Sequence, residues 1–279
     1  ASQLINEIQT RKAGVTRPSR SEEALNDEQI RTYAAEAANE LPARDPEADR
    51  ARQPFEVIDA WREGRNYVGL RVRVDDDDFR ESYERPGQYV TFQYDALEPR
   101  FLVIANAPAA DAEDWEFLID LDSDLGDISH EIAAGDEVVL SPAEGSGYPS
   151  IDLDGHHILM FTTGSGIASM RPVIQHWARR PDEGPDALAL YYGEASEEDF
   201  AYAREFPDWR RAGVRLFRAI EDIPHPEEGY RYVQHAFEDD DPSLEDAFVF
   251  VSGAPIMMEM IIAKLIGLGV DPERIFTNI

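Results

Sequence analysis

A glycine-rich turn at residues 163–169, with the sequence Thr-Gly-Ser-Gly-Ile-Ala-Ser, points most directly to chemistry. It follows an apolar segment expected to be a strand and precedes a segment with helical spacing. Glycines in such a turn let the backbone approach a pyrophosphate, whose charge the helix N-terminus stabilises. No Lys-Ser or Lys-Thr pair follows, which excludes a Walker-type phosphate loop. The turn favours nucleotide binding, and a tight turn that holds no ligand is the alternative.

Other chemistries lack the residue types or the spacing that they need. The chain has no Cys, which excludes disulfides, cysteine-ligated iron–sulfur clusters and thiol catalysis. Residues 120–124 with Glu131 carry carboxylates at calcium-loop spacing, but the glycine falls at position seven instead of six. His156 and His157 begin a strand and have no carboxylate at ligand spacing. We expect no metal site.

The segments that precede the turn have the pattern of a β-barrel. Apolar Val68, Leu70 and Val72 alternate with Gly69 and Arg71, which predicts a half-buried antiparallel strand over residues 67–74. Several short strands at close spacing indicate a barrel or a sandwich. Further strands are expected at residues 88–93, 101–106, 115–121 and 137–140.

Beyond residue 155 strands and helices alternate, which predicts a doubly wound parallel sheet. The fold class is therefore a β-barrel followed by an α/β domain. Strands are expected at residues 158–162, 187–192, 214–219 and 247–252, and helices from the turn to 180, at 197–211 with a break near Pro207, and at 256–268. The predicted units are a helical N-terminal extension at 1–53, with its helix over 21–41, a barrel at 54–150 and an α/β domain at 151–279.

The order of short motifs from about residue 55 to 279 resembles the ferredoxin–NADP reductase superfamily, in which a flavin-binding barrel precedes a nicotinamide-binding domain. Three blocks, at residues 140–148, 232–234 and 277–278, are especially similar to a branch also found in plants. The blocks that carry the resemblance read Arg85-Pro-Gly-Gln-Tyr-Val, Arg100-Phe-Leu-Val-Ile-Ala-Asn, Gly126-Asp-Ile-Ser, Leu140-Ser-Pro, Thr163-Gly-Ser-Gly-Ile-Ala-Ser, Leu190-Tyr-Tyr-Gly and Ser252-Gly-Ala-Pro.

The resemblance implies bound FAD on the barrel. Arg100 stands where the family binds the flavin pyrophosphate, a task that suits the planar donor fork of a guanidinium. Leu102 replaces the family's Tyr that packs on the flavin ring, and Val103 replaces the hydroxyl that bonds flavin N5. Gly126 and Ser129 match the second flavin block. An empty site, with Arg100 paired to local acids, is the alternative.

The resemblance also implies a nicotinamide site. Gly164, Gly166 and Ile167 match the family's turn, with Ser169 in place of its Pro, and Gly193 ends the next strand block. Ser252 stands at the position of the family's Cys near the transferred hydride. Gly253 and Pro255 complete that motif.

The resemblance gives a preference between the two nicotinamide nucleotides. Many NADP-using members place Arg two residues after Gly193, where this chain has Ala195, followed by Glu197 and Glu198. Carboxylates repel a 2′-phosphate and suit a 2′-hydroxyl. NADH is therefore expected in preference to NADPH, with Arg171 as the nearby cation that would accommodate NADPH.

The expected function is hydride transfer from NAD(P)H to FAD and onward to an acceptor, which is a small molecule or a protein. The rival is a degenerate relative that binds a nucleotide and acts as a regulatory or interaction module. That rival predicts the loss of the family's Tyr, hydroxyl and Cys, replaced here by Leu102, Val103 and Ser252.

The charge of the chain points to its surroundings. The sequence has 57 Asp and Glu against 26 Lys and Arg, a net charge of −31. The acids cover the whole chain, and at ordinary salt such a charge repels itself. We expect a cytoplasmic protein of a salt-accumulating halophile. A basic face for nucleic acid is not expected, and no apolar run is long enough to span a membrane.

Overall fold

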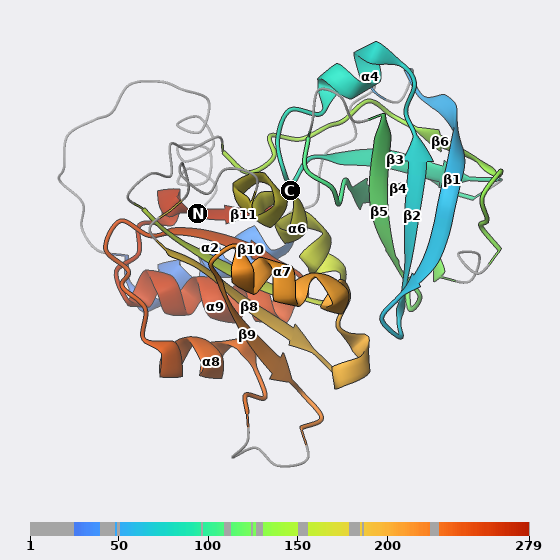
Figure 1. Cartoon of the computed structure of the whole chain (residues 1–279). Coiled ribbons are helices and arrows are strands. Elements are labelled where there is room, and N and C mark those ends of the chain that lie inside the picture. The colour runs from blue at the N-terminus through green and yellow to red at the C-terminus, as the bar shows by residue number, and fades with distance from the viewer. Residues whose placement is uncertain are drawn as a thin grey trace.

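The computed structural model consists of an antiparallel barrel and a parallel α/β domain (Figure 1). The predicted fold class is thereby confirmed. The structure describes residues 25–39, 48, 51–95, 97–108, 113–123, 125–126, 131–149, 156–178, 185, 187–223 and 229–278.

The barrel is an antiparallel sheet of six strands within the described ranges, in the order β4-β3-β6-β1-β2-β5. Its edges meet just after β4, where the backbone N–H of Ala105 donates to the carbonyl of Glu116 on β5 at 2.7 Å. The side chain of Asn106 adds bonds to the same strand. The strands are β1 (Gln53–Glu63), β2 (Tyr67–Arg73), β3 (Tyr89–Tyr94), β4 (Arg100–Val103), β5 (Asp114–Asp120) and β6 (Glu137–Leu140).

The barrel core contains the apolar residues that the alternation predicted. Leu70 and Val72 of β2 are fully buried beside Phe117 of β5. A short helix, α4 (Asp77–Ser82), covers one end of the barrel with Phe79. The acidic run at residues 75–78 leads into this helix, because the Asp76 carboxylate accepts from the Phe79 N–H and caps the first turn.

The α/β domain has a five-stranded parallel sheet in the order β11-β10-β7-β8-β9. Because β8 and β9 follow on one side of β7 while β10 and β11 return on its other side, the order reverses between β7 and β10. The strands are β7 (His157–Thr163), β8 (Ala187–Glu194), β9 (Val214–Ile220), β10 (Phe248–Ser252) and β11 (Ile275–Thr277).

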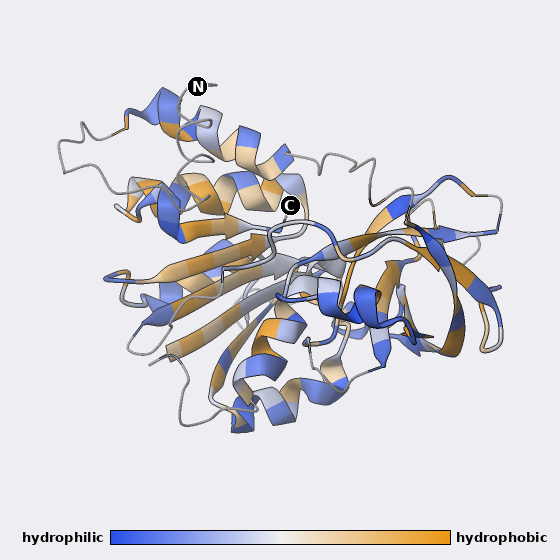
Figure 2. Ribbon diagram, turned by 90° about the horizontal axis from the view of Figure 1, so that it is seen from above, coloured by the Kyte–Doolittle hydropathy of each residue, from blue (hydrophilic) through white to orange (hydrophobic). Residues whose placement is uncertain are grey.

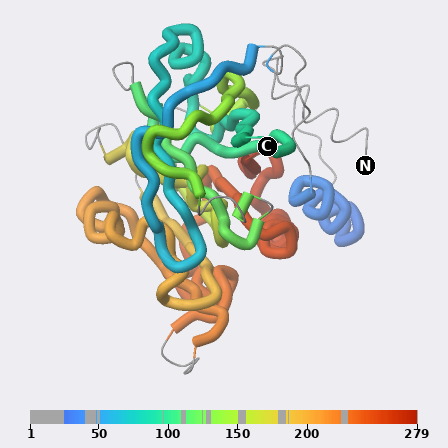
Figure 3. The backbone as a smooth tube through the Cα atoms, turned by 90° about the vertical axis from the view of Figure 1, so that its right-hand side faces the viewer, coloured from blue at the N-terminus to red at the C-terminus, as the bar shows by residue number. Residues whose placement is uncertain are grey.

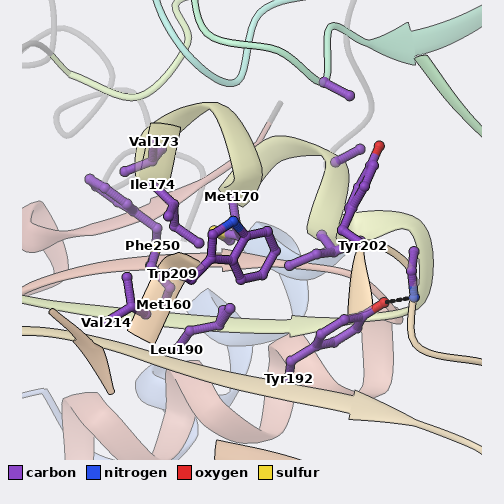
Figure 4. Close-up of a cluster of buried hydrophobic side chains, with 14 of the residues drawn as sticks. Met160, Met170, Val173, Ile174, Leu190, Tyr192, Tyr202, Trp209, Val214 and Phe250 are labelled. Carbon is purple, nitrogen blue, oxygen red and sulfur yellow. Dashed lines mark hydrogen bonds between the residues drawn. The ribbon is translucent and has the colours of Figure 1, made fainter. Parts of the chain in front are cut away.

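Helices cover both faces of this sheet, and the apolar strands lie between them (Figures 1 and 2). On one face, Met160 and Leu190 pack with Met170 of α6 and Trp209 of α7 (Figure 4). On the other face, the strands pack with α8 and α9. The helices are α6 (Ile167–Ala178), α7 (Phe206–Arg211), α8 (Val233–Asp240) and α9 (Pro255–Gly267), with single 3-10 turns η1 (Gly164–Gly166), η2 (Glu197–Asp199), η3 (Ala203–Glu205) and η5 (Pro272–Arg274).

The N-terminal helix α2 (Asp27–Asn39) lies beside α9 as an outer layer (Figure 3). Its Ala34 is fully buried and its Ala38 nearly so, in the same apolar cluster as Ile262 of α9. The helix is shorter than the predicted 21–41, and residues 21–24, 40 and 41 fall outside the described ranges. The small residues of α2 therefore attach the N-terminal segment to the nucleotide-binding half.

Several elements differ from the expectation. Residues 197–211 form separate turns and the short helix α7, and Pro207 lies in the first turn of that helix instead of interrupting one. Helix α8, whose last residue Asp240 accepts from the Tyr191 hydroxyl at 2.6 Å, was not predicted. The strands β1 and β11 were not predicted either.

Candidate functional site

The glycine-rich turn lies where the strand order of the parallel sheet reverses. Open α/β sheets bind ligands at this point, beyond the carboxyl ends of the strands. Gly164 has a φ of +59°, and a Cβ on Gly166 would lie 2.6 Å from the carbonyl oxygen of Ser252. A Cβ on Gly253 would lie 2.5 Å from Oγ1 of Thr163. Glycine is required at 166 and 253 because the end of β7 packs directly against the end of β10.

A cavity of about 950 Å³ opens from this turn to the barrel. A volume of this order suits a drug-sized or cofactor-sized ligand. Its lining combines glycines, apolar side chains and three carboxylates with one Arg. The lining residues are Val103, Asp120, residues 163–166, 193–195 and 231–234, Glu221, residues 252–254, Ile256, Met257, Met260 and Asn278.

The structure brings together six of the twelve predicted site residues at this cavity. They are Val103, Gly164, Gly166, Gly193, Ser252 and Gly253. Ile167 is buried at the first position of α6, and Pro255 begins α9, so these two shape the elements behind the cavity. Arg100, Leu102 and Gly126 lie on the barrel away from the lining, and Ser129 falls outside the described residues.

The predicted flavin residues on β4 divide between two faces. Successive strand residues point to opposite sides, so Val103 reaches the cavity while Leu102 packs partly on the barrel core. Arg100 is half-buried at the start of β4, where its Nη1 donates to the Pro99 carbonyl at 3.3 Å. Gly126 has a packing reason of its own, because a Cβ there would lie 1.8 Å from the Leu121 carbonyl oxygen.

A half-buried carboxyl that the sequence did not reveal stands at the cavity wall. Glu194 ends β8, and its Oε1 accepts from the hydroxyls of Tyr192 at 2.6 Å and Tyr67 at 3.1 Å. Its Oε2 accepts from Tyr67 at 3.2 Å. Burial raises the pKa of Glu194 to about 7, against the two tyrosine hydrogen bonds, which lower it. Tyr67 comes from barrel strand β2, so the two domains hold this carboxyl jointly.

Arg171 was expected to accommodate NADPH, and that expectation was wrong. Its Nη1 donates to Glu116 Oε2 at 2.6 Å and to the Ala105 carbonyl at 2.9 Å, both on the barrel. Its Nε donates to Glu205 at 2.9 Å, and the guanidinium stacks 4.5 Å from the Tyr202 ring. Arg171 is buried in the domain boundary and does not line the cavity.

Two further ion pairs join the domains. Glu63 of β1 accepts from the Tyr202 backbone N–H at 2.9 Å and from Arg204 at 2.7 Å. Arg65 donates to the buried carboxylate of Asp199 at 3.0 Å. Together with Arg171 these contacts hold the barrel in one orientation against the nucleotide-binding half.

Several lining residues were predicted for other roles or not at all. Asp120 was noted only as part of a calcium-loop pattern. Met260 is 54% exposed at the cavity, whereas Met258 of the same helix is buried. Arg231 and Glu221 were missed. The signal for Arg231 was its place directly before the block at 232–234 that resembles the plant branch.

The described residues fit a nucleotide. The glycine turn opens the 12-residue helix α6, and residues 163–166 of the turn line the cavity. Tyr232, Ile256 and Met260 offer apolar surface at the same cavity. The arrangement can hold a pyrophosphate at the turn and place a ring between Ser252 and Val103.

Comparison with known proteins gives a family for the second half. Residues 160–262 match the family of oxidoreductase NAD-binding domains. The chain is 23% identical to the sulfhydrogenase 2 subunit gamma of Pyrococcus furiosus over 164 residues, which cover 54% of this chain and 56% of that protein. It is 29% identical to NADH-cytochrome b5 reductase 2 of Emericella nidulans over 112 residues, 38% of this chain and 34% of that protein. The chain therefore spans about half the length of the first of these relatives and about a third of the length of the second.

Comparison of folds extends the likeness to both domains. A ferredoxin NADP⁺ reductase of Neisseria gonorrhoeae, solved with bound FAD and NADP, superposes with a TM-score of 0.66 at 15% identity. The match covers 81% of this chain and 98% of that one. Among the helices that the structure describes, none is long and apolar enough to cross a membrane.

Proposed function

We propose that this chain, a member of the ferredoxin–NADP reductase fold superfamily with an oxidoreductase NAD-binding domain, is an FAD-dependent NAD(P)H oxidoreductase. The nicotinamide nucleotide binds along the Gly164 turn and passes hydride to the flavin, which reduces an acceptor. The flavin supplies the redox chemistry, and the protein binds and orients. One observation carries the proposal: a single cavity joins Val103 of the barrel to Gly164 and Ser252 of the nucleotide domain.

The predicted flavin residues and Ser252 take separate roles in this proposal. Arg100 binds the flavin pyrophosphate from the barrel edge, with Gly126 and Ser129 in the second block. Val103 faces the flavin ring from the cavity, and Leu102, which packs partly on the barrel core, supports β4 behind it. Ser252 stands beside the transferred hydride, and its carbonyl already packs on the nucleotide turn.

NADH is the preferred nucleotide in this proposal. Ala195 lines the cavity where many NADP-using members place Arg, and Glu221 lines it nearby. Carboxylates disfavour a 2′-phosphate. With Arg171 held by Glu116, the cation that remains to attract such a phosphate, among the described lining residues, is Arg231.

A non-catalytic nucleotide-binding module is the competing proposal. Leu102, Val103 and Ser252 replace three groups that the family uses, and this supports the competitor. The ordered cavity that links both domains favours the enzyme.

Flavin content separates the two proposals. The purified full chain should be yellow, release FAD on denaturation, and lose its flavin absorbance when NADH is added without oxygen. Arg100→Gln should weaken FAD binding about tenfold through loss of one charged contact. The control Arg73→Gln, which removes an exposed Arg paired with Glu56 on the same barrel, should not. A colourless protein that takes up no FAD would support the competitor.

Partners and surroundings follow from charge. With a net charge of −31, an acidic protein acceptor would be repelled at low salt, so a small diffusible acceptor is at least as well suited. We propose a cytoplasmic location in a salt-accumulating organism. Nucleic acid is not a proposed partner.

A further inference from the structure

Three carboxylates and one guanidinium line the cavity within the described residues. Asp120, Glu194 and Glu221 supply the negative groups, and Arg231 is the cation. Among the described residues, no Lys, Arg or His forms an ion pair with Glu194. A dinucleotide adds two negative charges through its pyrophosphate. The site therefore binds an anion in surroundings that already carry an excess of negative charge.

The Tyr67 hydroxyl links Glu194 to the phosphate turn. A Cβ on Gly164 would lie 3.6 Å from the Tyr67 hydroxyl, and that hydroxyl donates to Glu194 at 3.1 Å. One tyrosine hydroxyl thus separates the carboxyl from the turn. A charge on Glu194 would act on a phosphate there at short range and through partly buried surroundings, where screening is weak.

The groups around Glu194 leave it near its titration point. Tyr67 of β2 and Tyr192 of β8 donate to it, and Asp120 faces it from the end of β5. Asp199 faces it from η2, held by Arg65. Burial, the largest influence, raises the pKa of the Glu194 carboxyl to about 7. The free protein can therefore gain or lose this proton within the neutral pH range.

We propose that Glu194 takes up a proton when the pyrophosphate of a dinucleotide binds at the Gly164 turn, so that nucleotide affinity falls as the solution becomes alkaline. This inference rests on the proposed function, since it needs a dinucleotide at that turn. It adds a proton-linked control of binding by a residue that belongs to neither predicted motif.

The direction of the pH effect follows from the linkage between proton binding and nucleotide binding. Bound phosphate disfavours the charged carboxylate, so the pKa of Glu194 is higher in the complex than in the free protein. Affinity is then greatest below the free-protein pKa, falls as pH rises from that value to the pKa of the complex, and is level above it. If the pKa of Glu194 is one unit higher in the complex than in the free protein, the affinity falls about tenfold in total.

Calorimetric titration of the full chain with NAD⁺ tests this. NAD⁺ is chosen because it lacks the 2′-phosphate, which titrates near pH 6. Its dissociation constant should rise about tenfold between pH 6 and pH 9 at fixed salt, and at pH 7 buffers of different ionisation enthalpy should report net proton uptake. Glu194→Gln should remove both the pH dependence and the uptake, and bind more tightly than wild type at pH 9.

Two further variants keep the test specific. Glu245→Gln removes one charge from an exposed loop position of the same domain, outside the cavity, and should retain the wild-type profile. Tyr67→Phe removes one donor to the carboxylate and should move the transition to higher pH. A pH dependence that arises from any other group would persist in Glu194→Gln.

The outcomes separate the two proposals. NAD⁺ that binds with the same affinity at every pH, or a Glu194→Gln protein that keeps the wild-type profile, would overturn the proton linkage and leave the oxidoreductase proposal standing. NAD⁺ that binds none of these proteins at any pH would overturn both.

Discussion

Arg171 Nη1 of α6 lies 2.6 Å from Glu116 Oε2 of β5, and this pair joins the two domains. Both side chains are nearly buried, with 10% and 12% of their surface exposed. Arg71 holds the other oxygen of Glu116 at 2.8 Å. Burial favours the neutral acid, but the charges of Arg171 and Arg71 outweigh it and hold the pKa of Glu116 below its usual value. Glu116 therefore stays charged between two guanidinium groups.

Removing that charge should destabilise the chain. Glu116→Gln leaves Arg171 buried with Glu205 as its remaining carboxylate, and breaking a buried pair from one side costs about 3–5 kcal/mol. Urea unfolding at pH 7 measures the loss. The control Glu56→Gln breaks an exposed pair with Arg73 and should cost less than about 1 kcal/mol. Equal losses in the two variants would contradict a structural role for the buried pair.

The same ion pair makes the stability of the fold depend on pH. Because the pKa of Glu116 is lower in the folded state than in the unfolded chain, its contribution is complete above the unfolded value. It is lost as pH falls through the folded value. The stability difference between wild type and Glu116→Gln should therefore shrink in acid, as urea unfolding at pH 7 and pH 3.5 would show. A difference that is unchanged at pH 3.5 would contradict the lowered pKa.

The hydrogen bond between Tyr148 and Ser169 gives a third prediction. The Tyr148 hydroxyl lies 2.9 Å from Ser169 Oγ, both are buried, and the Tyr148 ring stacks on Phe250 at 4.5 Å. Ser169 stands where the family has Pro. Ser169→Pro is tolerable in the first turn of α6, but it leaves the Tyr148 hydroxyl without this partner, at a cost of about 1–3 kcal/mol.

A double-mutant cycle isolates that cost. In a Tyr148→Phe background no hydroxyl is left to satisfy, so Ser169→Pro should be less destabilising there by about 1 kcal/mol or more. Thermal unfolding of the four proteins supplies the coupling. Additive effects would show that the two residues act independently, and that the serine is not matched to the tyrosine.

Periodicity predicted the elements because burial of one face dictates it. Leu70 and Val72 alternate with polar residues since only one side of β2 meets the barrel core. β11 was missed because its three residues are too few for a period. Helix α8 was missed because it is only eight residues long. It buries only Val233, Ala236 and Phe237, and Tyr232 provides no side-chain cap to mark its start.

The site was only partly predictable, because part of it arises from domain docking. The glycines at 164 and 166 carry a local signal, since the turn itself needs them. Glu194 carries none, because its importance comes from Tyr67, which lies 127 residues away along the chain. Arg171 was misjudged because its nearness to the turn in sequence does not reveal that its side chain reaches the barrel.

Ala195 gives a prediction about nucleotide choice. This exposed residue lines the cavity two positions after Gly193. Ala195→Arg should lower the KM for NADPH about tenfold through a charged contact with the 2′-phosphate, and should leave the KM for NADH nearly unchanged. Steady-state kinetics with both nucleotides check this. Ala212→Arg, which adds the same charge at an exposed position outside the cavity, is the control. A wild-type protein that prefers NADPH would contradict the proposed preference.

The net charge of −31 predicts that folding depends on salt. Repulsion among exposed acids destabilises the compact state, and raising the salt from 0.1 M to 1 M shortens the screening length from about 10 Å to about 3 Å. The melting temperature should therefore rise by about 10 °C or more between 0.1 M and 3 M KCl. A variant with Asp75→Asn, Glu81→Gln, Glu137→Gln and Glu245→Gln removes four exposed charges. It should melt higher than wild type at 0.1 M KCl and converge with it at 3 M, because screening then replaces the substitutions. Parallel salt curves for the two proteins, or a flat wild-type curve, would show that charge repulsion does not limit stability here.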